Sequence, residues 1–103
     1  MDKQVIWSPE AVDDLHSIVE FISKDSEYYS SAVTTKILTT TKQIGNFPLS
    51  GRIVPELNNE KIRERLVYSY RVTYIIREES VLITAIIHGK RLIENIEDRI
   101  KDT

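Results

Sequence analysis

The residues best suited to chemistry are a group of cations and one histidine in the second half of the chain. Arginine supplies six of the eight cations in residues 51–91, and His88 stands where the last predicted strand ends. A guanidinium group suits bidentate contacts with phosphate or carboxylate, and a histidine can transfer a proton near neutral pH. Together they could bind a phosphate group and move a proton. A hydrogen-bonded histidine at a strand end is the more common role for His88. The alternative role for Arg63 and Arg65 is pairing with Glu60, Glu64 or carboxylates of the loop.

Other signatures of catalysis are missing from the sequence. There are three glycines, no cysteine and two histidines that lie far apart, His16 and His88. These counts exclude a glycine-rich phosphate loop and a thiolate nucleophile, and the two histidines do not have the spacing of a metal-ligand pair. We therefore expect neither a metal nor a cofactor.

The net charge of −2 hides an uneven distribution. Residues 1–50 carry −3, residues 51–91 carry +3, and residues 92–103 carry −2. Proteins that bind nucleic acids are more often strongly basic. The charge pattern thus lowers the odds of an enzyme directed to the ribosome, while the basic segment keeps a local anionic partner open.

The length of 103 residues predicts a single domain over residues 1–103. The lack of cysteine favours a reducing compartment, and no leading apolar run or membrane-length apolar stretch is present. We expect a cytoplasmic protein with no membrane partner.

Periodicity and turn residues predict the elements that hold these side chains. The expected order is a strand at 4–7, a helix from Pro9 to a break at 24–26, a helix at about 27–44 stopped by Gly45, a loop at 45–60, strands at 62–68, 70–77 and 81–88, and a short helix at about 92–100. The short links between the three later strands predict an antiparallel meander. The fold class is α+β, an antiparallel sheet with an N-terminal strand and a helical hairpin packed on one face.

The pattern also predicts the core and the opposite face of the sheet. Side chains expected to be mostly buried are Val19, Ile22, Val33, Ile37, Val72, Tyr74, Ile83 and Ala85, and Trp7 is expected in the core rather than as a stacking platform. The face away from the helices should be partly open. If the register suits, it would be shared by Arg65, Arg71, Thr73, Thr84 and His88.

Several short motifs, in this order, resemble the RelE/ParE toxin superfamily over about residues 4–93. They are Trp7-Ser8-Pro9-x-Ala11, Pro48-x-Ser50-Gly51-Arg52-x-x-Pro55-Glu56-Leu57, Ile62-Arg63-Glu64, Tyr70-Arg71-x-x-Tyr74 and Ile87-His88-Gly89-x-Arg91. The resemblance implies a toxin of a type II toxin–antitoxin module that stabilises plasmids or responds to stress. A cognate antitoxin would neutralise it by wrapping around it, and operator DNA would be contacted only through the antitoxin.

The two branches of the superfamily imply different targets. RelE-like members cleave mRNA in the ribosome, and one subgroup uses a Glu, an Arg and a His, for which Glu56, Arg65 and His88 are the counterparts, with Arg71 steadying the phosphate. That subgroup has a tyrosine after the histidine, where this chain has Gly89-Lys90-Arg91. ParE-like members poison DNA gyrase, and the motif pattern favours this branch. Target-binding residues would then be Arg63, Arg65, Arg71, Lys90 and Arg91, and an inactive protein-binding relic is the third hypothesis.

Overall fold

A computed structural model describes residues 2–89 and 94–101 of the chain. Its elements are β1 (Gln4–Trp7), α1 (Pro9–Ser23), α2 (Glu27–Asn46), the 3-10 helix η1 (Pro48–Ser50), β2 (Arg52–Ile53), β3 (Ile62–Val67), β4 (Tyr70–Ile76), β5 (Ser80–His88) and α3 (Glu94–Lys101). The predicted α+β class is confirmed. Lys90 and Arg91, two of the expected target-binding residues, lie outside the described residues.

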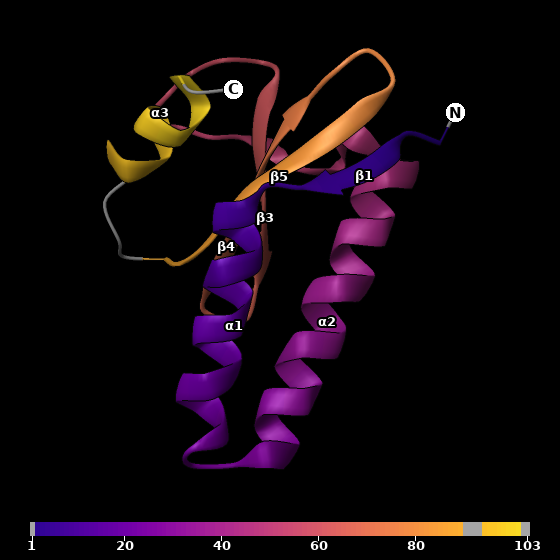
Figure 1. Cartoon of the computed structure of the whole chain (residues 1–103). Coiled ribbons are helices and arrows are strands. Elements are labelled where there is room, and N and C mark those ends of the chain that lie inside the picture. Colours follow the sequence, from indigo (N-terminus) through magenta and orange to yellow (C-terminus); the bar gives the residue numbers. More distant parts are fainter. Residues whose placement is uncertain (1, 90–93, 102–103) are drawn as a thin grey trace.

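The helices α1 and α2 form the predicted hairpin, and side-chain caps set where each helix begins. Ser8 Oγ accepts a hydrogen bond from the Ala11 N–H at 3.1 Å, and Ser26 Oγ accepts one from the Tyr29 N–H at 3.0 Å. Each cap satisfies an N–H group that the first turn leaves without a partner. The two helices run side by side, and the hairpin they form extends beyond the sheet (Figure 1).

Gly45 does not end α2, which continues to Asn46, so this prediction is wrong. The glycine instead allows β1 to pass close to the helix. A Cβ atom at position 45 would lie 2.6 Å from Val5 Cγ2 and 2.9 Å from the Lys3 carbonyl oxygen. The Lys3 N–H also donates to the Gly45 carbonyl at 2.8 Å, which joins the N-terminal segment to the end of α2.

The strands follow the order β1-β5-β4-β3-β2. As predicted, β3, β4 and β5 form an antiparallel meander. The first strand differs, because β1 pairs with β5 in parallel, from Gln4 opposite Ser80 to Trp7 opposite Ile83. The sheet is therefore mixed, and a two-residue strand within the predicted loop, β2, pairs with β3 at its edge.

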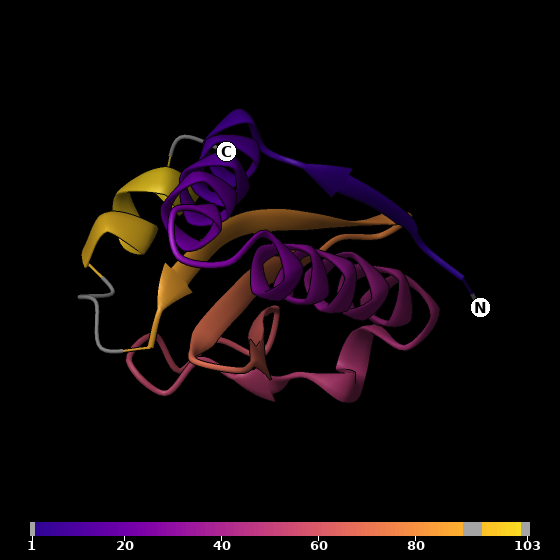
Figure 2. The same ribbon diagram turned by 90° about the horizontal axis from the view of Figure 1, so that it is seen from below.

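The main core lies between the helical hairpin and one face of the sheet (Figure 2). Of the eight residues predicted to be mostly buried, seven are buried, namely Ile22, Val33, Ile37, Val72, Tyr74, Ile83 and Ala85. Val19 is less buried than these seven residues and has an intermediate exposure. Trp7 is partly buried and packs against the core, as expected.

Arg71 and Thr73 share a face of the sheet, as expected, but the expectation that Arg65 lies with them is wrong. The link between β3 and β4 has two residues, Tyr68 and Ser69, and Tyr68 takes a φ of 54°. This turn places Arg65 opposite Val72 and Leu66 opposite Arg71. Because side chains alternate along a strand, Arg65 lies on the hairpin side, while Arg71 and Thr73 lie on the other side.

The face opposite the hairpin is also less open than expected. Arg71 and Thr73 are buried there, as are Ile62 and Leu82, whose register places them on the same side. The segment between β2 and β3 contributes the buried Val54 and covers part of this face.

Asp14, in α1, binds both β5 and α3 at the part of the β5 edge that β1 does not cover. Its Oδ2 accepts hydrogen bonds from the Ile86 N–H of β5 at 3.0 Å and from Arg99 Nη1 of α3 at 2.7 Å. Arg99 Nη1 also donates to the Thr84 carbonyl at 3.1 Å. The backbone groups on the edge of β5 that β1 leaves uncovered thus find hydrogen-bond partners in side chains of α1 and α3.

In the ranges that the structure describes, no helix is long and apolar enough to span a membrane.

Candidate functional site

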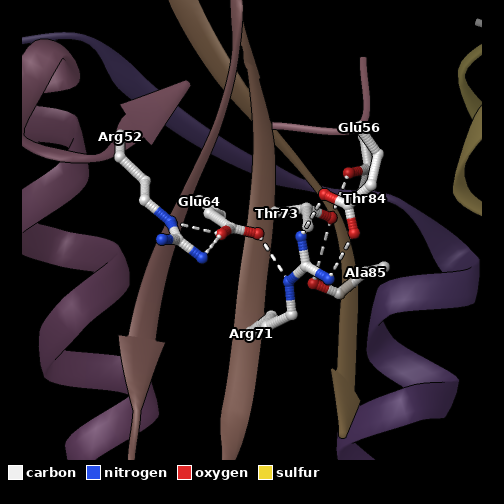
Figure 3. A network of polar contacts seen from close by, with 7 residues as sticks. All are labelled: Arg52, Glu56, Glu64, Arg71, Thr73, Thr84 and Ala85. Carbon is white, nitrogen blue, oxygen red and sulfur yellow. Dashed lines mark hydrogen bonds and ion pairs between the residues drawn. The ribbon is translucent and has the colours of Figure 1, made fainter. Parts of the chain in front are cut away.

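Arg71 is the centre of a charged network on the face opposite the helical hairpin (Figure 3). Its Nη1 and Nη2 donate to the two carboxylate oxygens of Glu56 at 2.9 and 2.8 Å. Its Nε donates to Glu64 Oε1 at 2.6 Å. The side chain is 7% exposed, so burial and two carboxylates hold it in place. A fork of this kind is among the stronger charged contacts in proteins.

Glu64 joins Arg71 to a second arginine. Its side chain is fully buried, and its Oε2 accepts from Arg52 Nε and Nη2, both at 2.6 Å. The chain of contacts therefore runs Arg52, Glu64, Arg71, Glu56, with alternating charge. Each of the two Glu64 oxygens has a guanidinium partner, which is the condition for tolerating a buried carboxylate.

The contact between Arg71 and Glu56 favours the charged form of both groups. Hydrogen bonds from Arg71 hold the pKa of Glu56 below the ordinary value, although partial burial opposes this. The same bonds to Glu56, followed by those to Glu64, raise the pKa of Arg71. A carboxylate with a lowered pKa is a weak base, so Glu56 in this arrangement is poorly suited to take a proton.

Next to Arg71, β4 and β5 share a buried hydroxyl pair. The Thr73 and Thr84 hydroxyl oxygens are 2.8 Å apart, and either can donate to the other. A bulge in the pairing after Thr73 brings Thr84, a residue without a strand partner, to this place. Figure 3 shows the pair beside the charged network. If Thr84 donates to Thr73, the Thr73 hydroxyl has the Ala85 carbonyl oxygen as its own acceptor at 3.5 Å.

A surface hollow opens beside Arg71 at the end of the sheet. It is lined by Arg52, Pro55, Glu56, Leu66, Tyr68, Ser69, Arg71, His88 and Gly89. His88 is exposed, and its ring meets the ring of Tyr70 edge-on with centroids 5.9 Å apart. The hollow thus brings together Glu56, Arg71 and His88, three residues that the sequence indicated as candidates.

Arg65 and Arg63 lie elsewhere and make contacts of their own. Arg65 donates to Ser50 Oγ at 3.2 Å and to Gln43 Oε1 at 3.1 Å, which links β3 to α2. Arg63 donates to the carbonyls of Glu60 and Gly51 at 2.9 and 3.0 Å. The expected trio of Glu56, Arg65 and His88 is therefore not assembled at one place.

Two members of the network, Glu64 and Arg52, were not among the residues that the sequence indicated as members of a site. Glu64 was an expected partner for Arg63 or Arg65, whereas its partners are Arg52 and Arg71. The sequence did offer one signal for Glu64. It lies in a strand on the same face as the apolar Ile62, where a charged side chain needs a buried partner.

In the described part of the chain, no three His, Cys, Asp or Glu residues gather closely enough to hold a metal ion.

Comparison with known proteins agrees with this fold. A solved structure described as the chromosomal ParDE TA system from P. aeruginosa matches with a TM-score of 0.70 at 13% identity, covering 85% of this chain and 97% of that one. Comparison with curated proteins gave no match. The profile of the family described as ParE toxin of type II toxin–antitoxin system, parDE, matches residues 5–93. The chain therefore belongs to the ParE toxin family, within the RelE/ParE superfamily.

Proposed function

We propose that this protein is a toxin that acts by binding DNA gyrase, without nuclease chemistry, and that a cognate antitoxin neutralises it. Membership of the ParE toxin family supports the toxin–antitoxin part of the proposal. The choice of gyrase over RNA as the target depends on one observation. Glu56 and Arg71 bind each other through two hydrogen bonds, so neither is free to act on RNA.

This contact argues against RNA cleavage. Attack by a 2′-hydroxyl needs a base that accepts its proton and cations that are free to stabilise the phosphate. Glu56 has a lowered pKa, and both outer nitrogens of Arg71 are bound to it. Arg65, the expected third member, is on the hairpin side of the sheet. Contact with a protein target requires none of these groups to be free.

Exposed apolar side chains on α2 and the β3–β4 turn form a surface suited to binding the antitoxin. Tyr28 and Tyr29 of α2 are exposed, and so is Tyr68 at the β3–β4 turn, which lines the same shallow hollow as Tyr28. The rings of Tyr29 and Tyr68 have centroids 6.1 Å apart, so helix and turn form one continuous patch. Patches of this kind on a small protein commonly mark a protein-binding surface. We propose that an apolar segment of the antitoxin covers it.

The test of the target uses one preparation in two assays. Purified protein should inhibit supercoiling by gyrase and leave ribosome-bound mRNA intact. His88→Ala should leave that inhibition in place, as should His16→Ala, which removes the other exposed histidine and serves as the matched control. Codon-dependent mRNA cleavage that is lost in His88→Ala but kept in His16→Ala would contradict the proposal. Harmless expression of soluble, folded protein would favour the inactive relic.

The second candidate function is ribosome-dependent mRNA cleavage. The observation in its favour is that Glu56, Arg71 and His88 line one hollow. On this hypothesis Arg71, rather than Arg65, would contact the phosphate. Cleavage should then be abolished by His88→Ala while Arg65→Ala retains it, a combination that the gyrase proposal does not predict.

The antitoxin surface has its own test. Tyr68→Asp places a charge in the apolar patch and should weaken co-purification with the antitoxin at least about tenfold, since a desolvated charge costs more than about 1.4 kcal/mol. Phe21→Asp is the matched control, because Phe21 is 69% exposed on α1 and does not line the shallow hollow that Tyr68 shares with α2. Equal antitoxin binding by both variants would refute this surface.

A further inference from the structure

We propose that the corner between α2 and β2 is the surface through which this protein contacts its protein target. The corner consists of residues 47–51 and the two arginines that surround them, Arg63 and Arg65. Its occupant is a surface of the target that has an apolar pocket with carboxylates around it. The inference rests on the proposed function, because it names the contact surface for that same target.

Two large apolar side chains of the corner are exposed to water. Phe47, which lies between α2 and η1, is 68% exposed, and Leu49, within η1, is 71% exposed. A single exposed apolar residue is ordinary, whereas two within three residues concentrate apolar area at one place. Burial of both by a partner would remove that area from water, so the two side chains are suited to be anchors of an interface.

The backbone that carries these anchors is held in one conformation. The hydroxyl group of the buried Tyr74 donates to the Pro48 carbonyl at 2.6 Å and accepts from the Gly51 N–H at 3.0 Å. Arg63 Nη1 donates to the Gly51 carbonyl at 3.0 Å. A loop that is already fixed loses little conformational entropy when a partner binds.

The two arginines give the corner a positive charge that the fold does not neutralise. Arg63 donates to backbone carbonyls, and Arg65 donates to side-chain oxygens of a serine and a glutamine. Among the described residues, no carboxylate forms an ion pair with either arginine, whereas Arg71 pairs with two. Burial raises the pKa of Tyr74, and the nearby charges of both arginines oppose this rise. Positive charge around apolar anchors complements carboxylates on a partner.

The corner is separate from the surface proposed for the antitoxin. The hollow of that surface is lined by α2 residues from Tyr28 to Thr39 and by Tyr68. The corner begins after Asn46, about 10 Å further along the helix than Thr39. Substitutions in the corner should therefore weaken contact with the target and leave antitoxin binding unchanged.

The first experiment tests the anchors with purified gyrase as the probe. It measures binding to gyrase without DNA and inhibition of supercoiling, in each case with the full chain. Phe47→Ala and Leu49→Ala each remove one anchor, and Phe21→Ala is the matched control, because Phe21 of α1 is 69% exposed. We expect each anchor variant to bind at least about tenfold more weakly than wild type, while Phe21→Ala matches wild type.

The second experiment tests the charge of the partner at a single position. Leu49→Lys and Leu49→Asp both remove the apolar side chain and differ in the sign of the charge that replaces it. Against an acidic partner surface, Leu49→Asp should bind gyrase at least about fivefold more weakly than Leu49→Lys at low ionic strength. The difference should shrink as salt is added, because salt screens exposed charges.

Weaker gyrase binding by both anchor variants, with unchanged circular dichroism and antitoxin co-purification, supports the corner. Wild-type inhibition that persists in both variants overturns the corner and leaves the proposed function standing. Wild-type protein that neither binds nor inhibits gyrase overturns both proposals. Equal binding by Leu49→Lys and Leu49→Asp overturns the acidic partner, and loss of antitoxin binding in the anchor variants assigns the corner to the antitoxin instead. Binding of wild type to plasmid DNA alone, lost in the same variants, overturns the proposal in favour of nucleic acid.

Discussion

Replacing Glu64 with glutamine should destabilise the protein far more than an equal charge change at the surface. Each oxygen of Glu64 accepts hydrogen bonds from an arginine, whereas a glutamine side chain has a single acceptor oxygen. Glu64→Gln therefore turns one acceptor into an N–H donor that faces a guanidinium. Removing one member of a buried ion pair costs about 3–5 kcal/mol. Arg71 keeps Glu56 as a partner, and Arg52 is 59% exposed, so we take the lower end, about 3 kcal/mol.

The assay is urea-induced unfolding at neutral pH, followed by circular dichroism. A loss of about 3 kcal/mol is a large part of the roughly 5–15 kcal/mol expected for a domain of this size, and it should lower the melting temperature by more than about 10 °C. Glu60→Gln, in the exposed segment before β3, is the control and should change the free energy of unfolding by less than about 0.5 kcal/mol. If Glu64→Gln matches this control, the reasoning about the buried network is refuted.

Three further predictions concern single contacts. Gly45→Ala should destabilise by up to about 2 kcal/mol, because crowding against Val5 costs about 1–3 kcal/mol and the helix-propensity gain returns about 1 kcal/mol of it. A stabilised variant in urea unfolding would contradict this. Tyr74→Phe should cost about 1–3 kcal/mol in the same assay, since the buried hydroxyl is engaged in two hydrogen bonds, and a neutral result would show that these bonds contribute nothing net. The bond from Arg71 lowers the pKa of Glu56, so its stabilisation is present in full above the ordinary value of 4.5 and is lost as the pH falls through the lowered value. The stability difference between wild type and Glu56→Gln should therefore shrink between pH 7 and strongly acidic pH, and a constant difference in pH-dependent unfolding would count against the ion pair.

Local signals in the sequence predicted the helices and the meander well. The Ser8-Pro9 start predicted the beginning of α1, and the short link after Lys24 predicted the helical hairpin. These features depend on neighbouring residues. The parallel pairing of β1 with β5 joins residues 76 positions apart, from Gln4 to Ser80, and no local pattern specifies such a partner.

The candidate site was predicted less completely than the fold, because it depends on register. The two-residue turn between β3 and β4, with Tyr68 at positive φ, placed Arg65 and Arg71 on different faces of the sheet. A turn of three residues in the same sequence would have placed both on one face. Glu64 was hard to recognise for a related reason. A glutamate between two arginines in a strand is typical of a solvated surface, and the residue that makes its burial tolerable, Arg71, belongs to the next strand.

The pairing of β1 with β5 has a consequence for the order in which the chain can fold. During synthesis β1 emerges long before its strand partner, which spans Ser80–His88. The helical hairpin can form early from local contacts, while β1 has to wait until β5 has left the ribosome. The sheet edge, and the packing of Val5 against Gly45 that accompanies it, should thus be completed last. A chain interrupted before Ser80 would have the helical hairpin but an incomplete sheet. The complete fold is therefore reached only after β5 has been made.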